Sequence, residues 1–179
     1  MTNTTGESEI WEQARAACSD TAARLSAADI APEALAEYVP ESRRLKFFTR
    51  SATMRPLGEV WRLGALLLGT HGTLYALGQA TRAAERGRVG YQSLSRESRR
   101  DLAAAALAGG YAAGTTVNFN AVALLLDGSV QLDDDPPPIG ILDGEIRVRW
   151  RSGASLNGAQ TLRSYLRERA DLLIHPPLS

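Results

Sequence analysis

The 179-residue chain has few of the residues that most often build reactive or metal-binding sites. It contains one cysteine, one lysine and two histidines. A single cysteine, Cys18, excludes an internal disulfide and a zinc site built on several cysteines. The one lysine, Lys46, does not follow a glycine run, so the chain lacks the phosphate-binding pattern Gly-x-x-x-x-Gly-Lys. The two histidines, His71 and His175, lie far apart and match no metal-ligand spacing.

Long apolar runs and a basic leader are also absent. No apolar run approaches the roughly 20 residues of a membrane-spanning helix. The first residues, MTNTTGESEIWEQ, are polar and acidic, which is unlike a secretory signal. We therefore expect a cytoplasmic protein with no membrane segment. Arginine accounts for almost all basic residues and alanine is frequent, and this bias predicts a bacterial, GC-rich coding sequence.

Motifs for common reactions are incomplete. Ser155 lies in GASLNG, where the second glycine, Gly158, falls one place too late for the hydrolase pattern Gly-x-Ser-x-Gly. The run 133–135 holds three aspartates without the spacing of a calcium loop. Cys18 lies in an apolar helical stripe, which favours a buried thiol over a nucleophile. We expect no cofactor, no metal and no catalytic residue, and we favour a non-enzyme.

Charge is unevenly distributed although the net charge is zero. Residues 1–41 carry a net charge of −6, residues 42–100 carry +9, residues 101–142 carry −5, and the remainder carries +2. We favour the interpretation that acidic and basic segments pack together in one chain or across a dimer. The alternative is an exposed basic face that binds an anion or a nucleic acid.

Four segments have the patterns of helices. Residues 8–27 place Ile10, Ala14, Cys18, Ala22 and Leu25 at helical spacing. A short second helix can open at Pro32 and end at Pro40. A third, over 95–108, is stopped by two glycines. The last runs from about 158 to 174, with Asn157 and Gln160 as a capping box. Its expected buried stripe is Leu162, Tyr165, Leu166, Ala170 and Leu173.

Three loops separate apolar runs as hairpin turns do. They are Thr70-His71-Gly72, Asp127-Gly128 and Asp143-Gly144. Together with the helices they predict an α+β fold, in which an antiparallel β-sheet of several hairpins, roughly five to seven strands, is covered by the helices at 95–108 and 158–174. We divide the chain into an N-terminal helical arm, residues 1–40, and a single α+β domain, residues 41–179.

The first of these hairpins predicts a shallow floor formed by glycines. A loop at 70–72 pairs Gly64 with Gly78 and places Arg62 and Arg82 on the same face. Two glycines side by side indicate that something approaches the sheet closely. We favour the alanine-rich helix at 95–108 as that neighbour, and a small anionic ligand held by Arg62 and Arg82 is the alternative. His71 is expected to be an exposed turn residue.

A second arginine set comes from strand alternation. Arg147, Arg149 and Arg151 alternate with apolar residues, so period two predicts three guanidinium groups on one face of a strand. They can form a solvated face or an anion-binding ladder. Nucleic-acid binding could add the segment RRLKFFTR, where Phe47 and Phe48 could stack on bases. We disfavour nucleic acid because the chain has no overall basic character.

The segments MRPLGEVWRLGALLLGTHGTLYALGQATRA and YQSLSRESRRDLAAAALAGG resemble a group of short actinobacterial proteins, some of which carry the label glutaminase. The resemblance covers residues 54–120. The serine-dependent glutaminase pattern Ser-x-x-Lys is missing, because Arg43 stands where the serine should precede Lys46. The amidotransferase type needs a nucleophilic cysteine on a glycine-rich elbow, and Cys18 lies in ARAACSDTAA. The residues do not support that label.

These observations favour a non-catalytic protein that acts through self-association or partner binding. The alternative is a small-molecule anion-binding protein or a hydrolase-type enzyme with an arginine-lined pocket. We expect a homodimer, since twofold dimers are the commonest oligomers. The helix at 8–27 should contribute to its interface, because its apolar stripe must be buried against its own domain or a second copy.

Overall fold

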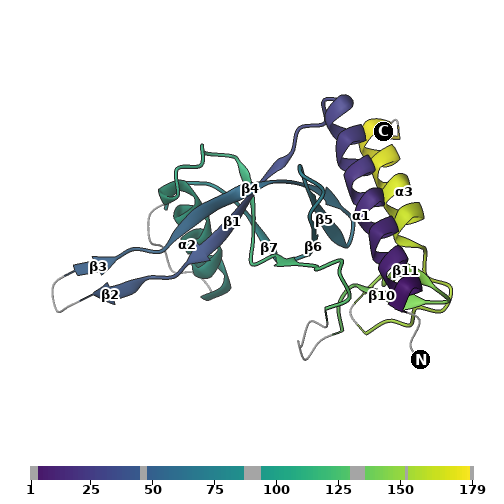
Figure 1. Cartoon of the computed structure of the whole chain (residues 1–179). Coiled ribbons are helices and arrows are strands. Elements are labelled where there is room, and N and C mark those ends of the chain that lie inside the picture. Colours follow the sequence, from purple (N-terminus) through teal and green to yellow (C-terminus); the bar gives the residue numbers. More distant parts are fainter. Residues whose placement is uncertain (1–3, 45–47, 87–93, 130–135, 152, 178–179) are drawn as a thin grey trace. The chain divides into compact units, whose positions relative to one another are not determined.

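The computed structural model describes residues 4–44, 48–86, 94–129, 136–151 and 153–177 (Figure 1). In these residues the chain forms three helices and eleven strands. The helices are α1 (Thr4–Ala27), α2 (Leu94–Ala108) and α3 (Leu162–Ile174). The strands are β1 (Glu33–Val39), β2 (Ser42–Arg44), β3 (Phe48–Arg50), β4 (Thr53–Leu63), β5 (Leu66–Gly69), β6 (Leu74–Ala76), β7 (Gln79–Arg82), β8 (Thr116–Phe119), β9 (Val122–Ala123), β10 (Ile139–Leu142) and β11 (Glu145–Val148).

The architecture is α+β, as the sequence predicted. Seven strands form one sheet in the order β7-β8-β1-β4-β5-β6-β9, and β2–β3 and β10–β11 form two-stranded sheets. The sheet is mixed rather than purely antiparallel, because β1 runs parallel to β8. No helix among the described residues is both long enough and apolar enough to cross a membrane.

The chain divides into two compact units that do not follow the predicted boundary at residue 40. Unit 1 comprises residues 1–32, 60–77 and 122–179, and unit 2 comprises residues 33–59 and 78–121. Strand β4 contributes its first residues to unit 2 and its last residues to unit 1. Each unit is therefore assembled from segments that are distant in sequence.

Unit 1 has a core built on α1 and α3, which pack against each other (Figure 1). Cys18 and Leu25 of α1 and Leu166 of α3 are fully buried in this core, together with side chains of β4, β5 and β6. Arg24 of α1 forms an ion pair with Asp171 of α3. The predicted N-terminal helix thus exists, but its apolar stripe is buried within unit 1.

The hairpin around His71 is confirmed, although it is shorter than expected. Strand β5 pairs with β6 in the predicted register, for example Leu67 with Tyr75. His71 is exposed in the turn, as predicted. The preceding strand does not continue through Gly64, however: β4 ends at Leu63, and Leu63 pairs with Leu66 across a two-residue turn. The predicted pairing of Gly64 with Gly78 is therefore wrong.

Tyr165 of α3 secures the β4–β5 turn. Its hydroxyl donates to the Leu63 carbonyl at 3.0 Å and accepts from the Ala65 backbone N–H at 2.7 Å. Gly64 has φ 62°, which a two-residue hairpin turn requires, and a Cβ there would collide with the Tyr165 hydroxyl. The turn and α3 are therefore fitted to each other at Gly64.

In unit 2, the segment predicted as a helix from Pro32 to Pro40 is strand β1. Residues 34–36 pair with 117–119 of β8, and Leu35 and Ala36 are buried. Backbone pairing with β8 overrides the helix propensity of the alanines and leucine, which is weak compared with tertiary interactions. The predicted helix at 95–108 is confirmed as α2, which packs its Ala105 and Ala106 into the core of this unit.

The close neighbour of Gly78 is not the predicted helix. A Cβ on Gly78 would collide with the backbone of Phe119 and Asn120, at the end of β8. The backbone of β8, rather than α2, explains the glycine. In the same unit, a Cβ on Gly109, just after α2, would collide with the Met54 carbonyl of β4.

The two Asp-Gly predictions have different outcomes. Asp143 and Gly144 form the two-residue turn that joins β10 to β11. Their φ values of 54° and 74° are positive, as such a hairpin turn requires. Asp127 and Gly128 also lie in a turn, but β9 pairs with β6 and no described strand follows the turn directly. The aspartates at 133–135 lie outside the described residues.

The last helix begins later than predicted. The N-cap of α3 is Thr161, whose hydroxyl accepts from the Ser164 backbone N–H at 3.3 Å. The capping box of Asn157 and Gln160 is therefore wrong. Four of the five predicted stripe residues are buried, and the exception is Leu173, which is 37% exposed.

Candidate functional site

The predicted ladder of three arginines is not formed. Strand β11 ends at Val148, so Arg151 lies beyond the strand. Arg147 donates from Nη1 to the Ala159 carbonyl at 2.9 Å, and Arg149 donates from Nη1 to the carbonyls of Pro137 and Ile139 at 3.1 and 3.0 Å. These two side chains bind backbone segments of unit 1 and have a structural role.

Arg62 and Arg82 are not cross-strand neighbours. Arg62 of β4 pairs with Leu67 of β5, and Arg82 of β7 pairs with Thr116 of β8. The prediction that they share one hairpin face is wrong, because the turn at Gly64 ends β4 earlier than expected. The five arginines proposed for anion binding therefore do not form the two sets predicted from the sequence.

Arg151 instead forms an exposed pair with Trp150. The guanidinium carbon of Arg151 lies 4.5 Å from the centre of the Trp150 ring system, a cation–π geometry. Trp150 is 72% exposed, which is the highest exposed fraction among the large hydrophobic residues in the described part of the chain. We call these two residues the tryptophan–arginine pair.

A surface hollow lies beside the first turns of α1. It has a volume of about 330 Å³ and is lined by Glu7, Ser8, Trp11, Arg15, Asp127 and Gly128. The Ser129 hydroxyl donates to Asp127 at 2.6 Å and lowers the pKa of that carboxyl, with help from the Ser129 backbone N–H. Asp127 is therefore ionised at neutral pH. We call this feature the acidic hollow.

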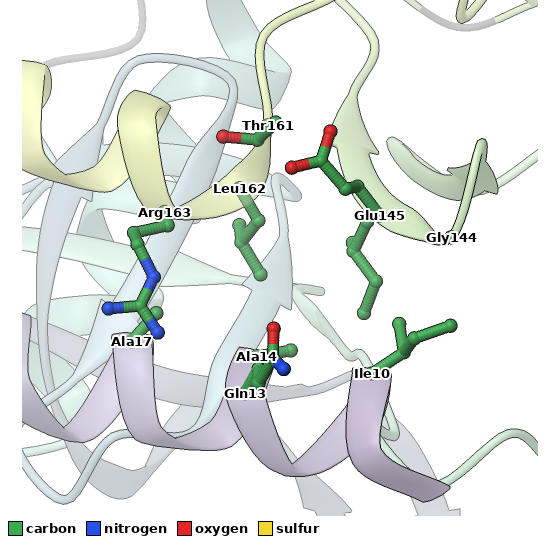
Figure 2. A pocket seen from close by; sticks show the side chains of 10 residues that line it. Ile10, Gln13, Ala14, Ala17, Gly144, Glu145, Thr161, Leu162 and Arg163 are labelled. Atoms are coloured by element: carbon green, nitrogen blue, oxygen red, sulfur yellow. The ribbon is translucent and has the colours of Figure 1, made fainter. Parts of the chain in front are cut away.

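A smaller pocket lies between α1 and α3, beside the β10–β11 turn (Figure 2). Its volume is about 90 Å³, roughly that of three water molecules in the liquid. Figure 2 shows the Arg163 side chain extending from α3 toward α1 and the Gln13 side chain extending from α1 toward α3. Leu162 and Ala14 contribute apolar surface. The pocket is much smaller than typical ligand pockets of about 300–1,000 Å³.

The groups with reactive potential are dispersed or buried. Burial raises the pKa of the Cys18 thiol to about 12, so the thiol is not a nucleophile at neutral pH. Among the described residues, no three side chains of histidine, cysteine, aspartate or glutamate gather in a way that could hold a metal ion. Lys46 and Phe47, which the sequence suggested for nucleic-acid contact, lie outside the described residues.

Neither the pair nor the hollow was predicted from the sequence. The spacing of Glu7, Trp11 and Arg15, each four residues apart, could have indicated that they share one face of a helix. Nothing local indicates that Asp127 lies beside them. The exposure of Trp150 was missed because strand alternation placed its side chain on the apolar face. Comparison of the chain with models of protein families, with curated proteins and with solved structures finds no match.

Proposed function

We propose that this chain is a non-catalytic, cytoplasmic protein that acts by self-association, through a surface centred on Trp150. The observation that carries the proposal is the 72% exposure of Trp150 beside the Arg151 guanidinium. Tryptophan and arginine are among the residues most enriched at the energetic centres of protein interfaces. A binding surface is the simplest role for such an exposed pair.

The charge distribution supports a second copy as the partner. Unit 1 carries exposed charges of both signs: Glu7 and Asp127 lie beside the first turns of α1, and Arg151 lies beside Trp150. Opposite charges within the same unit allow electrostatic attraction between the unit 1 surfaces of two copies, which speeds association and selects the partner. Self-association should therefore weaken as salt concentration rises.

The role proposed from sequence for the N-terminal helix changes in the light of the fold. Ala14, Cys18 and Leu25 of α1 are buried in unit 1, so the apolar stripe of this helix is not free to form a dimer interface. We do not propose an anion-binding pocket lined by arginines, because Arg147 and Arg149 already donate to backbone carbonyls.

The test is a measurement of mass in solution by light scattering and sedimentation over a range of protein concentrations. We expect a dimer that dissociates on dilution. Trp150→Ala should weaken the dimer by about 2 kcal/mol or more, as expected for an interface centre. The control is Leu57→Ala, which removes an apolar side chain that is 59% exposed in unit 2 and should leave the dimer unchanged. A chain that is monomeric at every concentration would refute the proposal.

A further inference from the structure

We propose that the acidic hollow of one copy receives the tryptophan–arginine pair of a second copy. This inference rests on the proposed self-association and specifies its contact. Both features belong to unit 1, so each copy carries one pair and one hollow. Two copies can then exchange two identical contacts around a twofold axis, which is the usual symmetry of dimers.

The hollow has an aromatic surface suited to a tryptophan. Trp11 lies between Glu7 and Arg15 on one face of α1, and it is partly buried against the core of unit 1. Gly128 packs closely against it, since a Cβ there would lie 3.0 Å from Trp11 Nε1. Aromatic pairs in offset or edge-to-face contact add stabilisation beyond the area that they bury.

The hollow also has the charge to bind a guanidinium group. Glu7 and Asp127 contribute two carboxyl groups, and the Ser129 donors favour the ionised form of Asp127. The cation among the lining residues, Arg15, already donates to the Leu126 carbonyl. The lining therefore carries a net negative charge that can pair with Arg151, and planar guanidinium groups are well suited to carboxylates.

The volumes and exposures agree with an exchange between copies. At about 330 Å³, the hollow is in the range of pockets that bind ligands of several rings or side chains. Trp150 is 72% exposed, so it does not fill the hollow of its own copy. An occupied hollow would cover both Trp11 and Trp150, and this contact therefore explains why aromatic surface of unit 1 is left open in a single copy.

The experiment uses complementary charge reversals in the full chain. Arg151→Glu should oppose insertion into the acidic hollow, and Glu7→Lys should oppose insertion of Arg151. Each variant alone should have a dimer dissociation constant raised at least about tenfold. In an equimolar mixture, one contact joins the two changed positions, whose charges are reversed but still opposite, and the second contact retains the original Arg151 and Glu7. The mixture should therefore form a heterodimer with an affinity close to that of the original chain.

Matched controls separate this contact from general charge effects. Glu9→Lys changes an exposed residue on the same helix, and Arg167→Glu changes an exposed arginine of α3. Neither residue lines the hollow. Each control variant alone should therefore keep the dimer affinity of the original chain, and mixing the two should not change it. Loss of dimer in both control variants, with recovery on mixing, would overturn the inference in favour of nonspecific attraction.

Indole resonances give an independent result. In the ¹H–¹⁵N spectrum, the indole signals of Trp11 and Trp150 should shift with dimer formation, and Trp150→Phe assigns one of them. Trp61 is the internal reference, because it is buried and its indole N–H donates to the Ile30 carbonyl at 2.8 Å. If the chain dimerises and Trp150→Ala dissociates it, but Glu7→Lys and the Trp11 signal show no effect, the hollow is refuted and the proposed self-association stands.

Discussion

Unit 1 and unit 2 bury different kinds of surface. Among the described residues, the core cluster of unit 1 contains nineteen buried side chains, including nine leucines. Seven of these leucines lie on β4, β5, β6, α1 and α3, and two, Leu124 and Leu126, follow β9. The cluster of unit 2 contains seven, and four of them are alanines. Unit 2 instead relies on close approach of backbone segments at Gly78 and Gly109. Large side chains dominate the core of unit 1, whereas in unit 2 small side chains and two glycines let backbone segments approach each other closely.

This difference can be followed separately in each unit. The three tryptophans, Trp11, Trp61 and Trp150, all belong to unit 1. Tryptophan fluorescence therefore reports on unit 1, whereas far-UV circular dichroism reports on both units. Comparing the two transitions in urea tests whether the units unfold independently.

The largest effect is expected from a cavity in unit 1. Leu166 is fully buried, so Leu166→Ala should lower the free energy of unfolding by about 2–5 kcal/mol. The loss should appear in the fluorescence transition in urea. Leu172→Ala makes the same change on the same helix at a residue that is 43% exposed, and it should cost less than about 0.5 kcal/mol. Equal losses in the two variants would contradict the core assignment.

The next effect should come from adding a methyl group to unit 2. Gly78→Ala places a Cβ against the backbone of Phe119 and Asn120, and we expect a loss of about 1–3 kcal/mol from overpacking. The circular dichroism transition should shift while the fluorescence transition stays in place. Ala80→Val, at an exposed position of β7, is the control. If Gly78→Ala shifts both transitions together, the two units unfold as one, and the expectation that they unfold independently is wrong.

A loss of similar size should follow from removing one hydroxyl of unit 1. Tyr165→Phe leaves the Leu63 carbonyl and the Ala65 N–H without their partner, which should cost about 1–3 kcal/mol. Calorimetry and fluorescence in urea would measure the loss. Tyr75→Phe in β6 is the control for loss of a phenol hydroxyl outside this turn. A neutral Tyr165→Phe would show that the turn does not depend on α3.

Acid should weaken unit 1 through two carboxyl groups. Hydrogen bonds from Arg24 to Asp171 and from Ser129 to Asp127 lower the pKa of these groups. A pKa that is lower in the folded state gives stability that is present at neutral pH and is lost as pH falls below the usual aspartate value of about 4. The fluorescence transition should therefore move to lower urea as pH falls from about 4. The double variant Asp127→Asn with Asp171→Asn should flatten this dependence, and an unchanged slope would contradict it.

The smallest effect should be found at the hairpin tip. His71 is exposed in the turn between β5 and β6, so His71→Asn should change the free energy of unfolding by less than about 0.5 kcal/mol. Asparagine suits turns well, so any change should be slightly stabilising. Thermal and urea unfolding would measure it. A loss of about 2 kcal/mol would show that the imidazole makes a buried hydrogen bond.

Local patterns predicted the elements whose sequence signals lie within one short segment. The helical spacing of 8–27 and 95–108 indicated α1 and α2, and Asp143-Gly144 indicated the β10–β11 hairpin. The register of β5 with β6 followed from the loop at 70–72. The turn at Gly64-Ala65 was missed because apolar residues continue on both sides of it. A glycine in the first position of a two-residue turn was the available indication.

Features that depend on distant segments were not predictable in the same way. Strand β1 contains helix-forming residues and becomes a strand because β8, about 80 positions later, pairs with it. Arg147 and Arg149 alternate with apolar residues in the sequence, which is also the pattern of a strand with one solvent-exposed face. Only the fold shows that carbonyls of neighbouring segments accept hydrogen bonds from these two arginines. The acidic hollow likewise combines α1 with a turn more than 110 residues away in sequence.

The packing of α1 against α3 has a consequence for synthesis on the ribosome. All segments of unit 2 have been translated by residue 121, whereas α3 is complete only at Ile174. At typical elongation rates of about 5–20 residues per second, α1 waits on the order of ten seconds for its helical partner. Unit 2 can therefore form first, and the apolar stripe of α1, with Cys18 and Leu25, stays without α3 throughout that interval. During that interval, the part of the stripe that α3 covers in the folded chain is open to chaperones.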